Sequence, residues 1–212
     1  MEKRETISFL DLDRTLYRTD EFLRGIRQDL VNRGYSSKRI DEHLVSLSRA
    51  GDYTFEQHLQ LLGMSREQIA HCVVLYREMQ KRGDAHLYDD VLPALPRLAK
   101  ASTCMLLTYG HPSYQQDKFL GIGSIQGFFQ GQHYAHRDRT KGEVIRDYAT
   151  QATTWFLDDS PAQLLDTKHK SPTTRLVRMM RTIDRLPPHY GDGTIWHVVP
   201  TFEAFVDLVE AG

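Results

Sequence analysis

The chain alternates between two kinds of hydrophobic pattern over much of its 212 residues. Short apolar runs rich in β-favouring residues predict buried strands at 6–10, 103–107, 127–129, 154–157, 175–179 and 197–199. Amphipathic stretches predict helices between them, at 91–100, 113–120, 141–148, from Pro161 onward and after Thr201. Because such alternation favours a parallel sheet, we expect an α/β fold with a Rossmann-like, doubly wound core.

One long segment departs from this alternation. From about 21 to 84, apolar residues such as Phe22 and Ile26 recur at helical spacing, which predicts three or four helices. One of these helices begins with a capping-box pattern, Ser65 followed three residues later by Gln68. Three aromatic residues of the segment are expected to form its own small core, with some facing a cleft: Tyr53, Phe55 and Tyr76. The sequence therefore predicts an α/β core of residues 1–16 and 88–212 with a helical module, 17–87, inserted into it.

Polar motifs stand where the predicted strands end. They are Asp11-Leu12-Asp13-Arg14-Thr15 after the first strand, Thr108 after the second, Lys141 before a helix, and Asp158-Asp159 after the strand at 154–157. The carboxyl ends of parallel strands meet at one edge of a sheet, and ligands bind there. We therefore expect these side chains to gather in one site.

The four motifs, in this order, resemble those of the haloacid dehalogenase superfamily: DxDxT, a strand-end Thr or Ser, a lone Lys, and DD. The resemblance covers residues 7–160 and implies a phosphatase-type member with a helical cap between the first and second motifs. It implies that Asp11 is the nucleophile and Asp13 the acid/base, and that Thr108 and Lys141 bind the phosphoryl group. An aspartate at position 13 favours phosphate esters over dehalogenase chemistry. One departure is Arg14, where many family phosphatases have Gly.

Elementary chemistry agrees with this resemblance. Phosphoryl transfer needs a nucleophile, a source of protons and positive charge on the non-bridging oxygens, and a carboxylate can attack phosphorus to form an acyl phosphate. Several carboxylates in one cleft require a compensating cation, and ligands that are all oxygen favour Mg²⁺. The resemblance assigns to the metal the Asp11 carboxylate, the Asp13 main-chain carbonyl and the pair Asp158 and Asp159, without deciding which of the pair binds directly. Candidate substrate contacts are the residues beside the motifs: Thr15, Tyr109, Gly110 and His111.

The composition indicates which partners and which cellular location to expect. The net charge of −1 provides no general attraction for polyanions, and we interpret the basic run from Lys168 to Arg185 as a solvated face, so nucleic acid is not an expected partner. The motif from His133 to His136 is interpreted as surface residues on a loop, and 186–193 as a turn-rich loop. With two separated cysteines, no signal peptide and no apolar run long enough to span a membrane, we expect a cytoplasmic protein that does not bind membranes.

The sequence leaves several alternatives open. The expected function is a Mg²⁺-dependent phosphohydrolase acting on a small phosphorylated metabolite through an aspartyl-phosphate. A phosphomutase would use the same groups, and a phosphatase that processes nucleic-acid ends would need the arginines at 175–185 to face the cleft. A non-catalytic phospho-acceptor domain would carry its acidic pair first, whereas here DxD comes first and DD last. The substrate, the pathway and the oligomeric state are not determined by the sequence.

Overall fold

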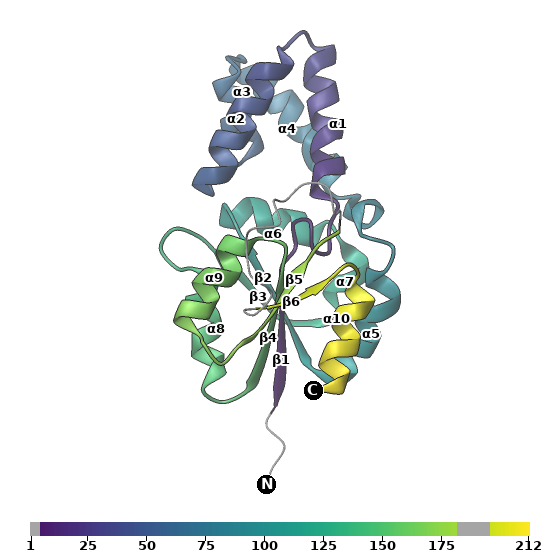
Figure 1. The fold of residues 1–212 in the computed structure, drawn as a ribbon. Coiled ribbons are helices and arrows are strands. Elements are labelled where there is room, and N and C mark those ends of the chain that lie inside the picture. The colour runs from purple at the N-terminus through teal and green to yellow at the C-terminus, as the bar shows by residue number, and fades with distance from the viewer. Residues whose placement is uncertain (1–4, 182–195) are drawn as a thin grey trace.

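A six-stranded parallel sheet forms the centre of the molecule (Figure 1). The structure, a computed structural model, describes residues 5–181 and 196–212. The strands are β1 (Thr6–Leu10), β2 (Thr103–Tyr109), β3 (Phe129–Ala135), β4 (Thr153–Asp158), β5 (Arg175–Met179) and β6 (His197–Val199), in the spatial order β3-β2-β1-β4-β5-β6. The predicted α/β class and parallel sheet are confirmed. With β1 between β2 and β4, the motifs that follow these three strands are brought side by side.

Helices cover both faces of this sheet. One face packs against α8 (Lys141–Ala149) and α9 (Pro161–Lys170), and the other against α5 (Val91–Ala101) and α10 (Phe202–Ala211) (Figure 1). Successive strand residues point to opposite faces, so Phe9 lies in the hydrophobic cluster on the α8 side and Leu10 in the cluster on the α5 side. Burial on both faces explains why the central strands are continuously apolar. Two further helices, α6 (Pro112–Leu120) and α7 (Gly123–Gln126), follow β2.

A group of helices lies beyond the carboxyl ends of the strands (Figure 1). It consists of α1 (Thr19–Asn32), α2 (Ser37–Ala50), α3 (Phe55–Leu61) and α4 (Arg66–Gln80), followed by the short 3₁₀ helix η1 (Gly83–His86). The predicted capping box between Ser65 and Gln68 is confirmed at the start of α4. We refer to α1 to α4 as the helical group.

The aromatic core of the helical group does not stand alone. Phe55 packs edge-to-face on Tyr76 within the group, with ring centroids 5.5 Å apart, but it also packs on Tyr114 of α6 at 5.2 Å. Tyr53 packs on the same ring at 5.1 Å. These residues belong to the hydrophobic cluster that also contains Leu10 of β1, so the expectation of a separate small core was wrong. Apolar contact therefore joins the helical group to the sheet side of the molecule.

Two other expectations need correction. The third strand runs to Ala135 instead of ending at Phe129, so His133 lies in a strand and not in a loop. This strand is the outer neighbour of β2, and its polar residues Gln130, Gln132 and His133 together with Gly131 hide the apolar signal of a buried strand. The predicted loop at 186–193 and Arg185 lie outside the described residues. Within the described ranges, no helix is long and apolar enough to cross a membrane, and both cysteines are buried and unpaired.

Candidate active site

Asp11 and Asp158 come together because their strands are neighbours in register. Leu10 is aligned with Leu157, and the Asp11 amide donates a hydrogen bond to the Leu157 carbonyl at 3.0 Å. Asp158 is the last residue of β4, and Asp11 directly follows β1. Both carboxylates are nearly inaccessible to water, with Asp11 3% exposed. The sheet thus forces two acidic groups into one buried position.

Lys141 supplies the nearest positive charge. It is the first residue of α8, which begins with a capping box in which Thr140 and Glu143 satisfy each other's backbone amides. Its Nζ donates to Asp11 Oδ1 and to Asp158 Oδ2, at 2.6 Å in each case. Burial alone would lower the pKa of the ammonium, but these two carboxylates raise it above its ordinary value, so Lys141 is charged.

One ammonium does not neutralise the acidic cluster. Carboxylate oxygens of Asp11, Asp158 and Asp159 all lie within 4.8 Å of one another. Burial, together with the neighbouring carboxylates, raises the pKa of Asp11 well above its usual range and that of Asp159 to about 7, although Lys141 opposes the change at Asp11. Such a cluster of hard oxygen donors with excess negative charge fits a divalent cation of the Mg²⁺ type.

The two members of the acidic pair differ in their protein contacts. Both carboxylate oxygens of Asp158 accept hydrogen bonds, Oδ2 from Lys141 Nζ and Oδ1 from the Ser160 amide at 2.8 Å. Asp159 is partly exposed, and its carboxylate makes no hydrogen bond within the described residues. Asp159 therefore has the more available oxygens for a cation. The expected role of the Asp13 main-chain carbonyl stays a prediction.

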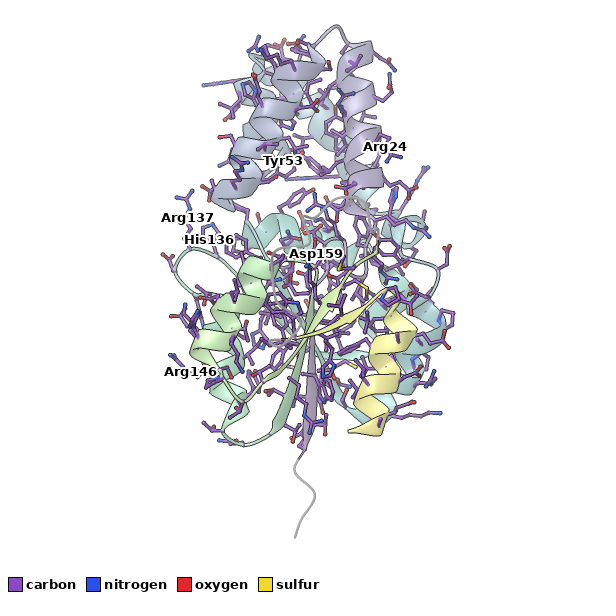
Figure 2. All side chains as sticks on the ribbon, in the orientation of Figure 1. Arg24, Tyr53, His136, Arg137, Arg146 and Asp159 are labelled. Carbon is purple, nitrogen blue, oxygen red and sulfur yellow. The ribbon has the colours of Figure 1, made fainter. Side chains whose placement is uncertain are left out.

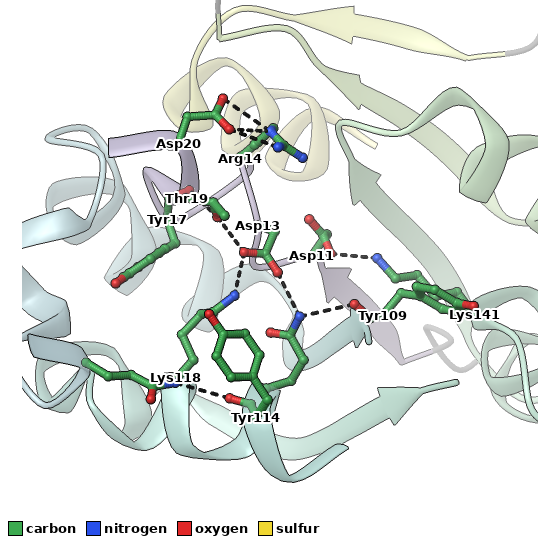
Figure 3. Close-up of polar contacts among 12 residues, drawn as sticks. Asp11, Asp13, Arg14, Tyr17, Thr19, Asp20, Tyr109, Tyr114, Lys118 and Lys141 are labelled. Atoms are coloured by element: carbon green, nitrogen blue, oxygen red, sulfur yellow. Dashed lines mark hydrogen bonds and ion pairs between the residues drawn. The ribbon is translucent and has the colours of Figure 1, made fainter. Parts of the chain in front are cut away.

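Asp13 is held by three donors (Figure 3). Thr19 donates its hydroxyl to Oδ1, Lys118 Nζ lies 2.6 Å from the same oxygen, and Gln115 Nε2 donates to Oδ2 at 2.9 Å. Burial would raise the pKa of Asp13, but the Lys118 ammonium and the three hydrogen bonds lower it to about 2. In this arrangement the side chain is an ionised carboxylate.

Lys118 and Gln115 were not predicted from the sequence. Both are on α6, and Lys118 is 2% exposed, with its ammonium 4.9 Å from the ring centroid of Tyr114. A lysine on a short helix ordinarily indicates a solvated face, because a charged side chain is rarely buried without a partner. The one available signal was its spacing, since Lys118 lies four residues after Tyr114 and three after Gln115 on the same helical face.

Two backbone conformations shape the loops of the site. Arg14 has φ 59°, in the left-handed region that glycine adopts most readily, and its side chain pairs with Asp20 at 2.8 Å. Gly110 has φ 147°, and a Cβ there would lie 2.8 Å from Gln115 Nε2. Since that nitrogen also donates to the Tyr109 carbonyl, Gly110 leaves room for the side chain that holds Asp13.

The remaining candidate residues divide into two sets. Tyr109, Gly110 and His111 line the cavity beside the aspartates, and His111 Nδ1 lies 3.0 Å from the Ser113 hydroxyl. Thr108 and Thr15 are fully buried, do not line the cavity, and have hydroxyls without a hydrogen-bond partner in the described part of the chain. The expected contact of Thr108 with a phosphoryl group and that of Thr15 with the substrate therefore stay predictions.

A cavity of about 280 Å³ lies between the sheet edge and the helical group. Its floor contains Asp11, Asp13, Lys141 and the acidic pair. The helical group and its connecting loop contribute the opposite wall: Leu23, Leu44, Ser48, Gly51 and Tyr53. A small ligand in this cavity would touch both parts of the molecule.

The loop after α2 contacts the loop after β3 at the margin of this cavity. Asp52 pairs with His136 at 3.0 Å and with Arg137, and Arg137 Nε donates to the Ala50 carbonyl at 2.9 Å. Figure 2 shows His136 and Arg137 directly below the helical group. Beside them, Gly51 packs so closely on the Tyr109 ring that a Cβ would lie 2.9 Å from it.

The basic run at 168–185 is not a uniform solvated face. Arg178 is 5% exposed within β5, and Arg181 donates to the Thr15 carbonyl and pairs with Asp90 at 2.5 Å. Arg175 stacks on Trp155. The interpretation of the whole run as solvated was therefore wrong for its buried members. Likewise, His133 bonds to the Tyr148 hydroxyl at 3.1 Å and His136 to Asp52, so both have protein partners.

Comparison with known proteins identifies the fold. No protein-family model and no curated protein sequence matches the chain. Solved structures do match over nearly their full length. The HAD-hydrolase YfnB from Bacillus subtilis bound to magnesium is 15% identical, with a TM-score of 0.66 and coverage of 98% of this chain and 99% of that one. A haloacid dehalogenase-like hydrolase from Burkholderia xenovorans is 17% identical, with a TM-score of 0.70 and coverage of 96% and 98%.

The L-2-haloacid dehalogenase from Xanthobacter autotrophicus, with chloropropionic acid covalently bound, is 16% identical, with a TM-score of 0.64 and coverage of 97% and 98%. The chain thus has the fold of the haloacid dehalogenase-like hydrolases, and the resemblance drawn from its motifs is confirmed at the level of the fold.

Proposed function

We propose that the protein is a hydrolase, specifically a Mg²⁺-dependent phosphatase of small phosphorylated molecules that works through an aspartyl-phosphate on Asp11. The observation that carries the proposal is the pairing of Asp11 with Lys141 at 2.6 Å on the floor of the cavity between the sheet edge and the helical group. A carboxylate beside a fixed ammonium can attack phosphorus while the ammonium stabilises the charge on the transferring group.

The residues divide the reaction into two steps. Asp11 attacks phosphorus, the bond to the leaving alcohol breaks, and that alcohol takes a proton. Water then attacks the acyl phosphate, loses a proton, and releases phosphate with Asp11 restored. Asp13 is the candidate for both proton transfers. Because Lys118, Gln115 and Thr19 hold it as a carboxylate, it is prepared for the base step, and the acid step requires it to gain a proton once substrate is bound.

Asp11, Asp158 and Asp159 would hold the Mg²⁺ ion, with the Asp13 carbonyl as the further ligand that the resemblance implies. When bound, the ion neutralises the carboxylates and withdraws charge from the phosphoryl oxygens. The helical group would serve as a cap that excludes water from the cavity. Binding can be measured without turnover, because Mg²⁺ should raise the thermal unfolding temperature of the wild type and raise that of Asp159→Asn much less.

A haloacid substrate is the main competing class, since one similar structure carries covalently bound chloropropionic acid. Two features favour a phosphate ester. Asp13 is present where the resemblance associates its loss with dehalogenases, and the acidic cluster around Asp11 calls for a cation that a phosphoryl group can share.

The test measures phosphate release from nitrophenyl phosphate and halide release from chloropropionate, with Mg²⁺ and with a chelator. Wild type should release phosphate only with Mg²⁺. Asp11→Asn should lose the activity because it removes the nucleophile, whereas Asp117→Asn, an exposed carboxylate outside the cavity on α6, should retain it. Halide release without phosphate release would replace the proposal by a dehalogenase, and phosphate release by Asp11→Asn at the wild-type rate would contradict the nucleophile.

A further inference from the structure

A groove between α1 and α2 continues from the catalytic cavity. It has a volume of about 540 Å³ and shares four residues with the cavity wall: Arg14, Leu23, Leu44 and Ser48. A ligand with its phosphoryl group at Asp11 can therefore extend between the two helices. Figure 2 shows Arg24 on the helical group, above Asp159 at the edge of the sheet.

The groove has a net positive charge. Among the described residues, four arginines line it, Arg14, Arg24, Arg27 and Arg49, against two aspartates, Asp20 and Asp41, which gives these lining residues a net charge of +2. The whole chain has a net charge of −1, so this local excess does not follow from composition. It lies beside a site proposed to bind a phosphate.

Two of the four arginines are already paired. Arg14 is 2.8 Å from Asp20, and Arg27 is 2.8 Å from Asp41. Arg24 and Arg49 are exposed, and their side chains make no hydrogen bond or ion pair within the described ranges. A guanidinium without a carboxylate partner offers a planar set of donors that matches a carboxylate or phosphate. The positive charge of the groove that no aspartate neutralises is therefore on Arg24 of α1 and Arg49 of α2.

We propose that this groove binds a second anionic group of the substrate, a carboxylate or a phosphate, contacted by Arg24 and Arg49 while the phosphoryl group lies at Asp11. Leu23 and Leu44 line the passage between the two positions, which suits a short uncharged carbon chain. The inference rests on the proposed phosphatase function and narrows its substrate to a phosphate monoester that carries a second negative group.

The experiment compares three substrates with one carbon chain: butyl phosphate, the phosphate monoester of hydroxybutanoate, and butanediol bisphosphate, together with their shorter and longer homologues. In the wild type, kcat/KM for at least one bifunctional series should exceed that for the alkyl phosphate of equal length. Arg24→Gln and Arg49→Gln should each lower this ratio about tenfold, the effect of a lost charge-assisted contact. The matched control is Arg66→Gln, an exposed arginine of α4 outside the groove, which should keep the wild-type ratio.

Preference for the carboxylate or for the bisphosphate identifies which anion the groove accepts. A wild type that treats all three substrates equally, or a double Arg24→Gln, Arg49→Gln variant that keeps the preference, overturns the inference. If no substrate is hydrolysed, the phosphatase proposal fails, but the groove can still be tested separately by measuring ligand binding with calorimetry. Asp11→Asn should bind butanediol bisphosphate more tightly than butyl phosphate, and replacement of both Arg24 and Arg49 by Gln should remove this difference. Equal binding of the two ligands by Asp11→Asn would contradict the proposal that the groove binds a second anionic group.

Discussion

The ammonium of Lys118 lies 2.6 Å from Oδ1 of Asp13, a residue 105 positions away in the chain. Lys118 is almost completely buried, and Asp13 is its ion-pair partner among the described residues. The contact ties α6 to the loop after β1, so the position of the proposed acid/base depends on a helix that the motifs do not include. The pair is therefore both a stabilising contact and part of the site.

Replacing Lys118 with Met should leave the Asp13 carboxylate without its main cation. We expect the free energy of unfolding to fall by about 3 kcal/mol, because breaking one side of a buried ion pair leaves an uncompensated charge. Urea titration measures the change. Lys81→Met, which removes an exposed lysine paired with exposed Glu78, should cost less than about 1 kcal/mol. Equal losses in the two variants would show that the buried pair contributes no more than a surface one.

Arg14 provides a test of backbone strain. Its φ of 59° favours glycine, whereas alanine at this position keeps the strain and loses the side chain that pairs with Asp20. Arg14→Gly should therefore be more stable than Arg14→Ala by about 1 kcal/mol, as judged by chemical denaturation. The exposed Arg14–Asp20 pair is lost in both variants and cancels in the comparison. Greater stability of the alanine variant would be incompatible with the left-handed conformation.

His58 should make stability depend on pH. Its ring is buried on α3 with Nε2 3.2 Å from the Ile40 carbonyl and Nδ1 3.4 Å from the Tyr53 hydroxyl, and burial lowers its pKa to about 4. The unfolded chain, with an ordinary pKa of about 6.5, binds more protons between these values, so stability falls as pH falls through this window. The full loss is about 3 kcal/mol.

Thermal or urea unfolding between the two pKa values tests this dependence. The stability of the wild type minus that of His58→Gln should fall as pH falls through that range, while His71→Gln, an exposed histidine on α4, should track the wild type. A stability difference between wild type and His58→Gln that does not change with pH would exclude a neutral, buried His58.

Asp52 should influence catalysis through cap closure. Its carboxylate meets His136 and Arg137 across the margin of the cavity, and Asp52→Asn weakens both contacts without a change of volume. We expect kcat/KM for nitrophenyl phosphate to fall about threefold to tenfold, because closure of the cavity excludes water and completes the site. Asp147 lies on α8 and forms an exposed pair with Arg139, so Asp147→Asn serves as the control and should keep wild-type kinetics. Unchanged kinetics in Asp52→Asn would show that this contact does not govern closure.

Local patterns were sufficient for the elements whose burial is uniform. The strand at 175–179 and the helix after Thr201 lie where the apolar runs predicted them, because each buries its residues in a regular pattern. The strand at 197–199 also lies where it was predicted, although only Val199 of its three residues is buried. The strand at 129–135 was only partly predicted, since its polar residues and Gly131 contribute no apolar signal. An element with regular burial has a periodic hydrophobic pattern in the sequence, whereas an outer strand with fewer buried residues has a weaker pattern.

The sequence by itself determined the order of the motifs and the α/β class, because strand-end polar residues and hydrophobic periodicity are encoded within a few neighbouring positions. Only the tertiary structure decided how these groups are paired: Lys141 between Asp11 and Asp158, and Lys118 on Asp13. The burial of Lys118 depends on a helix packed against a distant segment, and the net charge of the groove depends on how α1 and α2 pack against each other. Contacts of this kind join residues far apart in the chain, and no local pattern records which distant partner a charged side chain will meet.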